Sequence, residues 1–218
     1  MVSFVLWEHE AQVRFLHPRP ILKNMIYNSD SDDWLIVDNF SKDQVLLFKN
    51  SINKLIDNFN LKSDITGKST KGLNAQQFDL FQHITDISHV VKIVQTKVEN
   101  VLLQKIKSVK SAWTVLGYEN SFHTVHKHNT KIFNSHVATV TYLNMPNEYD
   151  EHRTGNFYAI LQDANKVNFN FLHEPKEGDI LIFPVWVYHG TMPQPKGLRH
   201  TLSIDFELDK EKSRHEVD

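Results

Sequence analysis

The chain contains no cysteine, which excludes two kinds of structure at once. Disulfides cannot form, and a bound metal must take its ligands from imidazole, carboxylate, carbonyl or water rather than from thiolate. Long apolar stretches are also missing, because no run approaches the roughly eighteen residues of a membrane-spanning helix. Glu8 and Glu10 come too early for the apolar part of a signal peptide. We therefore expect a soluble, cytoplasmic protein with no membrane partner.

The charges are balanced and scattered. Lys and Arg number 24, Asp and Glu 26, and the formal net charge is −2, with no basic block anywhere. The usual electrostatic reason to propose a nucleic-acid partner is therefore absent. A length of 218 residues with 40% hydrophobic residues suits one domain, residues 1–218, with a sizeable core.

The first half of the chain shows helical patterns after one predicted strand, "DDWLIVDNF". "SKDQ" at 41–44 has the form of a capping box, and apolar residues then recur at helical spacing, which predicts a helix over 42–59. A second apolar stripe, from Ile84 to Val101, predicts a helix over roughly 77–106. We expect 1–107 to be a helical support region.

After residue 107 the pattern changes to short runs rich in β-branched and aromatic residues, such as "HVATVTYLNM" and "LRHTLSIDFEL". Gly, Pro, Asn and Asp separate these runs, and no helical segment lies between them. Such a series predicts an antiparallel sandwich or barrel over 108–208, followed by a polar tail over 209–218.

Histidines crowd one short segment, "HTVHKHN" at 123–129. On a strand, His126 and His128 point to the same face and can meet one metal ion, whereas His123 points away if the strand is regular. Two imidazoles do not hold a divalent metal firmly, so a third ligand is expected. His189, at the end of the apolar run in "FPVWVYHG", is the best candidate.

A second group follows on the last predicted strand. Alternation puts Arg199, Thr201 and Ser203 on one face, and His200, Leu202, Ile204 and Phe206 on the other. A guanidinium inside a barrel requires an anion, and its planar fork fits a carboxylate. The sequence thus predicts a metal site beside a carboxylate-binding group.

These motifs resemble those of the Fe(II)- and 2-oxoglutarate-dependent dioxygenases. The similarity covers about residues 108–208 and is strongest in "EGDILIFPVWVYHG…LRHTLSIDF". It is closest to a bacterial and phage group that has His-x-His in place of His-x-Asp. The opening "WLIVDNFSKDQVLLFKNSI" is also similar to the start of prolyl-hydroxylase-like members. The resemblance implies an α+β fold with a double-stranded β-helix, or jelly-roll, core that the N-terminal helices buttress.

The resemblance also implies residue roles. His126 and His189 would bind Fe(II), and Arg199 would bind the distal carboxylate of 2-oxoglutarate with help from Thr201, Ser203 and Tyr142. At the third metal position this chain departs from the family's usual aspartate, and we favour His128. Two alternatives stay open: a carboxylate such as Glu119 or Glu148 approaches from a loop, or a strand bulge pairs His123 with His126.

The implied activity is an oxygenase reaction. Oxygen and an unidentified small-molecule or protein substrate would be consumed, with hydroxylation of the substrate and release of succinate and CO2. A cupin-like metal-dependent enzyme that does not use 2-oxoglutarate is one alternative, and a non-catalytic β-barrel binding module is another.

Overall fold

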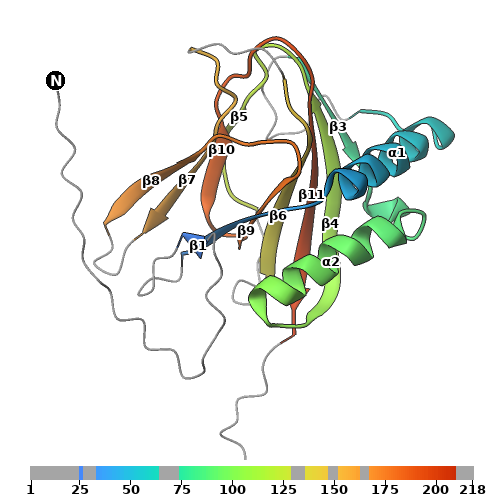
Figure 1. Cartoon of the computed structure of the whole chain (residues 1–218), viewed down its shortest axis with the longest axis horizontal. Helices are drawn as coiled ribbons and strands as arrows, with labels where there is room; N and C mark the ends of the chain where they lie inside the picture. Colours follow the sequence, from blue (N-terminus) through green and yellow to red (C-terminus); the bar gives the residue numbers. More distant parts are fainter. Residues whose placement is uncertain are drawn as a thin grey trace, which may run out of the picture.

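A computed structural model describes residues 25–26, 33–63, 74–128, 136–146, 152–162 and 167–209. Within these residues the protein is built from two antiparallel sheets and two α-helices (Figure 1). The large sheet has the order β1-β2-β9-β6-β11-β4-β3, and the small sheet has the order β5-β10-β7-β8. Two antiparallel sheets are typical of jelly-roll folds.

The strands have the following bounds: β1 Met25–Ile26, β2 Leu35–Asn39, β3 Ala75–Asp79, β4 Ile106–Gly117, β5 His123–His126, β6 His136–Asn144, β7 Phe157–Gln162, β8 Asn168–His173, β9 Asp179–Pro184, β10 Tyr188–Thr191 and β11 Arg199–Leu208. The longest pairings place β11 between β4 and β6, in the interior of the large sheet. The strand that carries Arg199 is therefore hydrogen-bonded to a neighbouring strand along both of its edges.

Helix α1, Lys42–Asn58, begins as the sequence predicts. The Ser41 hydroxyl accepts from the Gln44 amide, and the Gln44 side chain accepts from the Ser41 amide, so two free helix-end donors are satisfied. The apolar stripe of α1 is buried against the sheet. The predicted helix over 42–59 is confirmed.

The second predicted helix is only partly correct. Helix α2 runs over Ser88–Leu102, and its stripe from Val90 to Val101 is buried. The residues before it form β3 and a short 3₁₀ turn, η1, at Phe81–His83. β3 pairs with β4, so the region before residue 108 supplies strands to the large sheet as well as helices. Pairing with a strand that is distant in the sequence overrides the local helical pattern.

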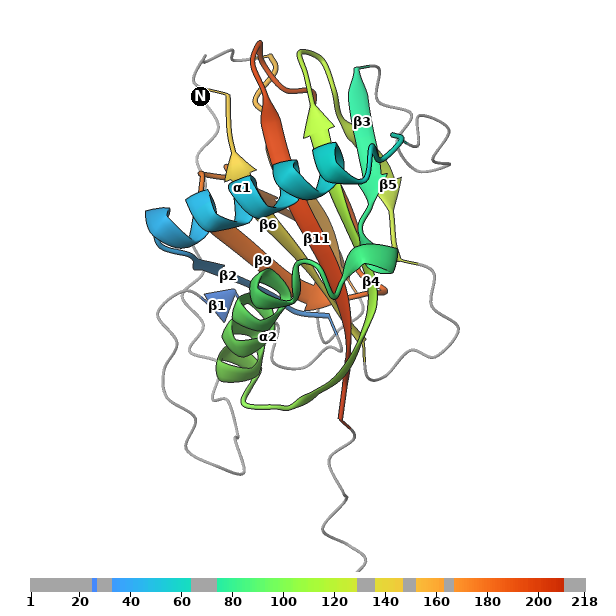
Figure 2. The same ribbon diagram turned by 90° about the vertical axis from the view of Figure 1, so that its right-hand side faces the viewer.

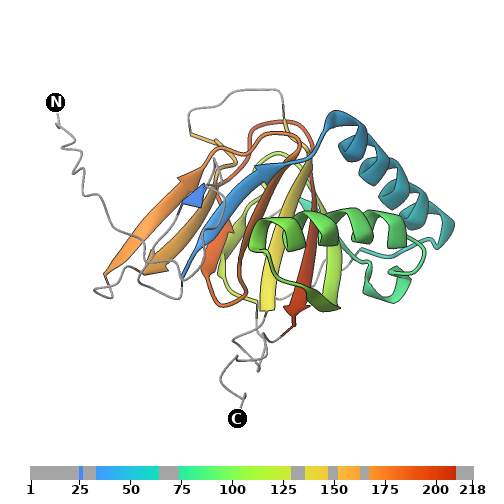
Figure 3. The ribbon, with the colours of Figure 1, turned by 60° about the horizontal axis from the view of Figure 1, so that its bottom comes forward.

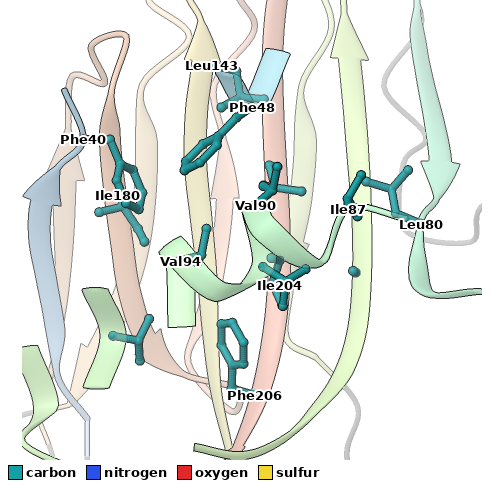
Figure 4. Packing of buried hydrophobic residues seen from close by; sticks show 14 of the residues in the cluster. Phe40, Phe48, Leu80, Ile87, Val90, Val94, Leu143, Ile180, Ile204 and Phe206 are labelled. Carbon is teal, nitrogen blue, oxygen red and sulfur yellow. The ribbon is translucent and has the colours of Figure 1, made fainter. Parts of the chain in front are cut away.

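Both helices lie across one face of the large sheet (Figure 2). Phe48 of α1 and Val94 of α2 pack in one cluster with Leu143 of β6 and Ile204 of β11 (Figure 4). The helices are on the side of the large sheet opposite the small sheet (Figures 1 and 3). Neither helix is long and apolar enough to cross a membrane.

A second apolar cluster fills the space between the two sheets. It includes Tyr142 of β6, Phe157 of β7 and Phe183 of β9, all of them buried. The apolar run around residues 179–191 is split: β9 belongs to the large sheet and β10 to the small one, with residues 185–187 joining them. This crossing brings His189 of the small sheet opposite the inner face of the large sheet.

Candidate active site

A cavity of about 310 Å³ opens between the sheets, and side chains from both sheets line it. The small sheet contributes His123, His126 and His189, and the large sheet contributes Tyr142, Arg199 and Asp205. All seven residues predicted to form the site line this cavity: Tyr142, His126, His128, His189, Arg199, Thr201 and Ser203.

His126, His128 and His189 come together at one end of the cavity. One ring nitrogen from each lies within 4.8 Å of the others. The ring centroids are 4.4 Å apart for His126 and His189, and 5.1 Å apart for His128 and His189. His126 and His189 are also direct partners in the pairing of β5 with β10. The three imidazoles are therefore placed to share one metal ion.

In each of these rings, Nδ1 lies at hydrogen-bond distance from a carbonyl or carboxylate oxygen, which accepts the bond. His126 Nδ1 donates to the Thr124 carbonyl at 2.8 Å, and His189 Nδ1 donates to the Val187 carbonyl at 2.9 Å. His128 Nδ1 lies 2.8 Å from the carboxylate of Asp205. These bonds fix the tautomer and leave Nε2 of each ring as the atom with a lone pair for a metal.

Burial keeps two of the three rings in the form that binds metal. Desolvation lowers the pKa of His126, and it lowers the pKa of His189 well below its usual value. Phe157 stacks on His189 with 5.6 Å between ring centroids, and Trp113 meets His128 edge-on at 5.1 Å. His126 and His189 therefore stay neutral to a lower pH than a free histidine.

His123 lines the cavity, whereas a regular strand would have pointed it away. The pairing of β5 with β10 shifts register between His126 and His123, so one extra residue of β5 restores His123 to the same face. Gly190 permits the close approach there, since a Cβ at this position would lie 2.7 Å from the His123 carbonyl and would collide with the Tyr158 hydroxyl. Burial and the nearby Arg199 charge lower the pKa of His123 to about 3.

Asp205 is a site residue that the sequence interpretation missed. It lies on β11, is 4% exposed, and accepts at Oδ1 from His128 and at Oδ2 from the Ser111 hydroxyl at 2.7 Å. The signal was present, because the alternation that places Arg199, Thr201 and Ser203 on the inner face continues to Asp205. The opposite set, including Leu202, Ile204 and Phe206, lies on the other face, as predicted, and packs in the cluster that includes the helices.

Arg199 places a guanidinium in the interior with little to neutralise it. The residue is 2% exposed, and its bond to the Gly155 carbonyl is long, at 3.4 Å. No carboxylate pairs with it in the part of the chain that the structure describes. Desolvation lowers the pKa of Arg199, although a guanidinium remains charged in proteins. A buried, unpaired cation of this kind requires an anionic ligand.

Tyr142 adds a hydrogen-bonding group without a partner. Its hydroxyl is fully buried and makes no hydrogen bond among the described residues, and burial raises the pKa of the phenol. Tyr142 lies opposite Thr201 in the pairing of β6 with β11, so the two neighbouring strands present hydroxyls beside the guanidinium. This end of the cavity suits a carboxylate in charge, donors and shape.

The carboxylates considered as replacement ligands do not reach the site in what the structure describes. Glu119 does not line the cavity and forms an ion pair with Arg153 at 2.8 Å. Glu148 lies outside the described residues. Asp205 is near the three histidines, but its oxygens are bonded to His128 and Ser111.

Comparison with known proteins decides the family. The model of the 2OG-Fe(II) oxygenase family matches residues 111–206, which include His126, His189 and Arg199. This segment, residues 111–206, is that of a 2OG-Fe(II) oxygenase. As an oxygenase it requires iron(II) and 2-oxoglutarate, which argues against a cupin-like enzyme that does not use 2-oxoglutarate and against a non-catalytic barrel.

Solved structures share the fold at low sequence identity. A prolyl-4-hydroxylase from Pseudomonas putida matches with 17% identity and a TM-score of 0.55, over 79% of this chain and 91% of its own. HygX from Streptomyces hygroscopicus, solved with nickel and 2-oxoglutarate, matches with 13% identity and a TM-score of 0.56, over 81% and 83%.

A prolyl hydroxylase from Trichoplax adhaerens, solved with a peptide fragment, matches with 11% identity and a TM-score of 0.59, over 79% and 83% of the two chains. No curated protein matches the sequence significantly. The structural matches establish the two-sheet oxygenase fold of this chain.

Proposed function

We propose that His126, His128 and His189 bind Fe(II) through Nε2, and that Arg199 binds the distal carboxylate of 2-oxoglutarate. Tyr142, Thr201 and Ser203 donate further hydrogen bonds to that carboxylate. One observation carries the proposal: a buried guanidinium without a carboxylate partner among the described residues shares a cavity with three converging imidazoles. An anionic ligand such as 2-oxoglutarate could bind the metal at one end and pair with the guanidinium at the other.

The residues of the chain orient and shield the reactants. Iron and 2-oxoglutarate, when bound, would supply oxygen activation, with release of succinate and CO2. The guanidinium fork of Arg199 would hold the distal carboxylate of 2-oxoglutarate and so orient the cosubstrate. Phe157 and Trp113, beside the histidine rings, keep water from the reaction centre.

We infer that the reaction is hydroxylation of a C–H bond. The cavity of about 310 Å³ is at the small end of the range for ligand sites, so cosubstrate and only a small part of the substrate fit inside it. Two solved relatives are named as prolyl hydroxylases, one of them with a peptide bound, which supports a peptide as one class of substrate.

We also propose that the chain is one domain in which residues 1–107 support the core at 108–208. Helices α1 and α2 bury the outer face of the large sheet, and Arg199 and Asp205 are on its inner face. The two helices would then stabilise, from its outer side, the sheet whose inner face carries these site residues.

Turnover without a prime substrate tests the proposed function. If the proposed sites for iron and cosubstrate are both present, purified protein with Fe(II), O2 and 2-oxoglutarate should form succinate that NMR detects. His189→Ala should form none. Wild-type protein that binds iron but forms no succinate at long incubation would argue against the proposal.

A further inference from the structure

The three histidines of the site are held in two different ways. His126 and His189 each bond the backbone carbonyl two residues earlier, so their orientation is set locally. His128 follows the end of β5, and its ring is held by the Asp205 side chain, which belongs to β11 of the large sheet. Unlike a backbone carbonyl, the buried carboxylate of Asp205 offers a formal negative charge as well as a hydrogen-bond acceptor.

We propose that Asp205 is a positioning residue that lets His128 take the place of the usual carboxylate ligand. It turns the His128 ring so that Nε2 faces the metal, and it supplies from behind the ring the negative charge that the common two-histidine, one-carboxylate site has in direct contact with iron. This inference rests on the proposed function.

Asp205 is itself fixed in place, as such a role requires. Its strand is paired with β4 and β6 on both sides, directly opposite Ser111 and Ala138. Ser111 donates to Oδ2, and this bond leaves Oδ1 for His128. A carboxylate that is 4% exposed loses most of its hydration, and these two bonds are the compensation within the described residues.

The same geometry explains why an aspartate does not suit position 128. In a His128→Asp variant, an oxygen of the shorter side chain would fall near the present Nδ1, which is 2.8 Å from Asp205. Two carboxylates would then face each other in a buried site, and like charges at that distance repel strongly. Histidine at 128 and aspartate at 205 form a matched pair.

Metal titration tests the pair without relying on activity. Calorimetry with Mn(II) alone should show weaker binding for Asp205→Ala, by about tenfold to 100-fold, as for other partners of metal-bound histidines. Asp205→Asn keeps an acceptor for His128 but loses the charge, and it should fall between wild type and Asp205→Ala. Glu207→Gln, on the same strand but outside the cavity and paired with Lys107 and Lys110, is the matched control and should bind within about twofold of wild type.

A compensating double variant separates positioning from a merely structural role. His128→Asp should bind Mn(II) poorly, and adding Asp205→Asn should restore binding by about tenfold, because the amide donates to the new carboxylate. The Co(II) absorption spectrum should change with Asp205→Asn as well. Equal Mn(II) affinity in wild type and Asp205→Ala, or no rescue in the double variant, overturns the inference alone. Wild-type protein that does not bind Mn(II) overturns the proposed function and the inference together.

Discussion

Arg199 carries its charge into a part of the protein from which water is excluded, and it finds no carboxylate there among the described residues. A cation in such a place destabilises the apo fold and gains most when an anion arrives. In the proposed function this residue would contribute part of the cosubstrate's affinity, and its planar fork would matter as much as its charge.

Arg199→Lys tests this use of the fork. Lysine keeps the positive charge but cannot make two parallel hydrogen bonds to a carboxylate, so the affinity for 2-oxoglutarate should fall about tenfold or more. Calorimetry with the Mn(II)-loaded protein measures the effect, and Mn(II) affinity itself should stay as in wild type. Arg153→Lys, at an exposed ion pair with Glu119, is the control. Unchanged 2-oxoglutarate affinity in Arg199→Lys would make Arg199 a structural residue.

At the scale of elements, the sequence predicts most where local patterns decide. The capping box and apolar stripe are sufficient for α1, and alternation on β11 correctly divides Arg199, Thr201 and Ser203 from Leu202, Ile204 and Phe206. These features depend on neighbours in the sequence. The convergence of β5, β10 and β11 follows only from the resemblance to a known family.

The errors have the opposite cause. β3 forms because β4 offers an edge for pairing, and His123 turns inward because β5 bulges against β10. Both are set by strands that are distant in the sequence, so no local pattern predicts β3, and the sequence allows the bulge at His123 only as one alternative. Asp205 was within reach, since it continues the inner face of β11, but its partner His128 lies beyond the end of a regular strand.

Ser41→Ala tests the role of α1 as an element of support. Loss of the Ser41 hydroxyl leaves the Gln44 amide without its acceptor and should lower the free energy of unfolding by about 1 kcal/mol. The affinity for 2-oxoglutarate should not change, because α1 packs on the outer face of the large sheet and the cavity is on the inner face. Urea unfolding and calorimetry measure the two quantities. A large loss of cosubstrate affinity would show that α1 shapes the site directly.

For the whole molecule, the large sheet separates two environments. One face forms an apolar core with the helices, and the other carries the polar site opposite the small sheet. Buried histidines occur on both faces, because His200 points toward the helix side and bonds the Thr114 hydroxyl at 2.8 Å. Burial lowers the pKa of His200 to about 4.

The stability of the apo protein should therefore depend on pH. Between about pH 6.5 and pH 4 the unfolded chain binds a proton at position 200 and the folded chain does not, so stability falls as the pH falls. From pH 7 to pH 5 this one group should remove on the order of 1 to 2 kcal/mol. The lowered pKa values of His123, His126 and His189 add losses of the same sign.

Urea unfolding of wild type and His200→Gln at both pH values isolates the contribution of His200. Glutamine keeps a donor for Thr114 but does not titrate, so the variant should lose less stability than wild type between pH 7 and pH 5. Equal losses in the two proteins would show that His200 does not keep a lowered pKa in the folded state.

The most direct test of the account is the visible charge-transfer band that forms when 2-oxoglutarate chelates Fe(II) under anaerobic conditions. We expect the wild-type protein to develop this band at one iron per chain, and His89→Ala, on the exposed side of α2, to behave in the same way. His189→Ala should develop no band. If wild-type protein saturated with iron and 2-oxoglutarate shows no band, or if His189→Ala shows it at wild-type iron concentrations, the three-histidine site beside Arg199 is not where the two ligands meet.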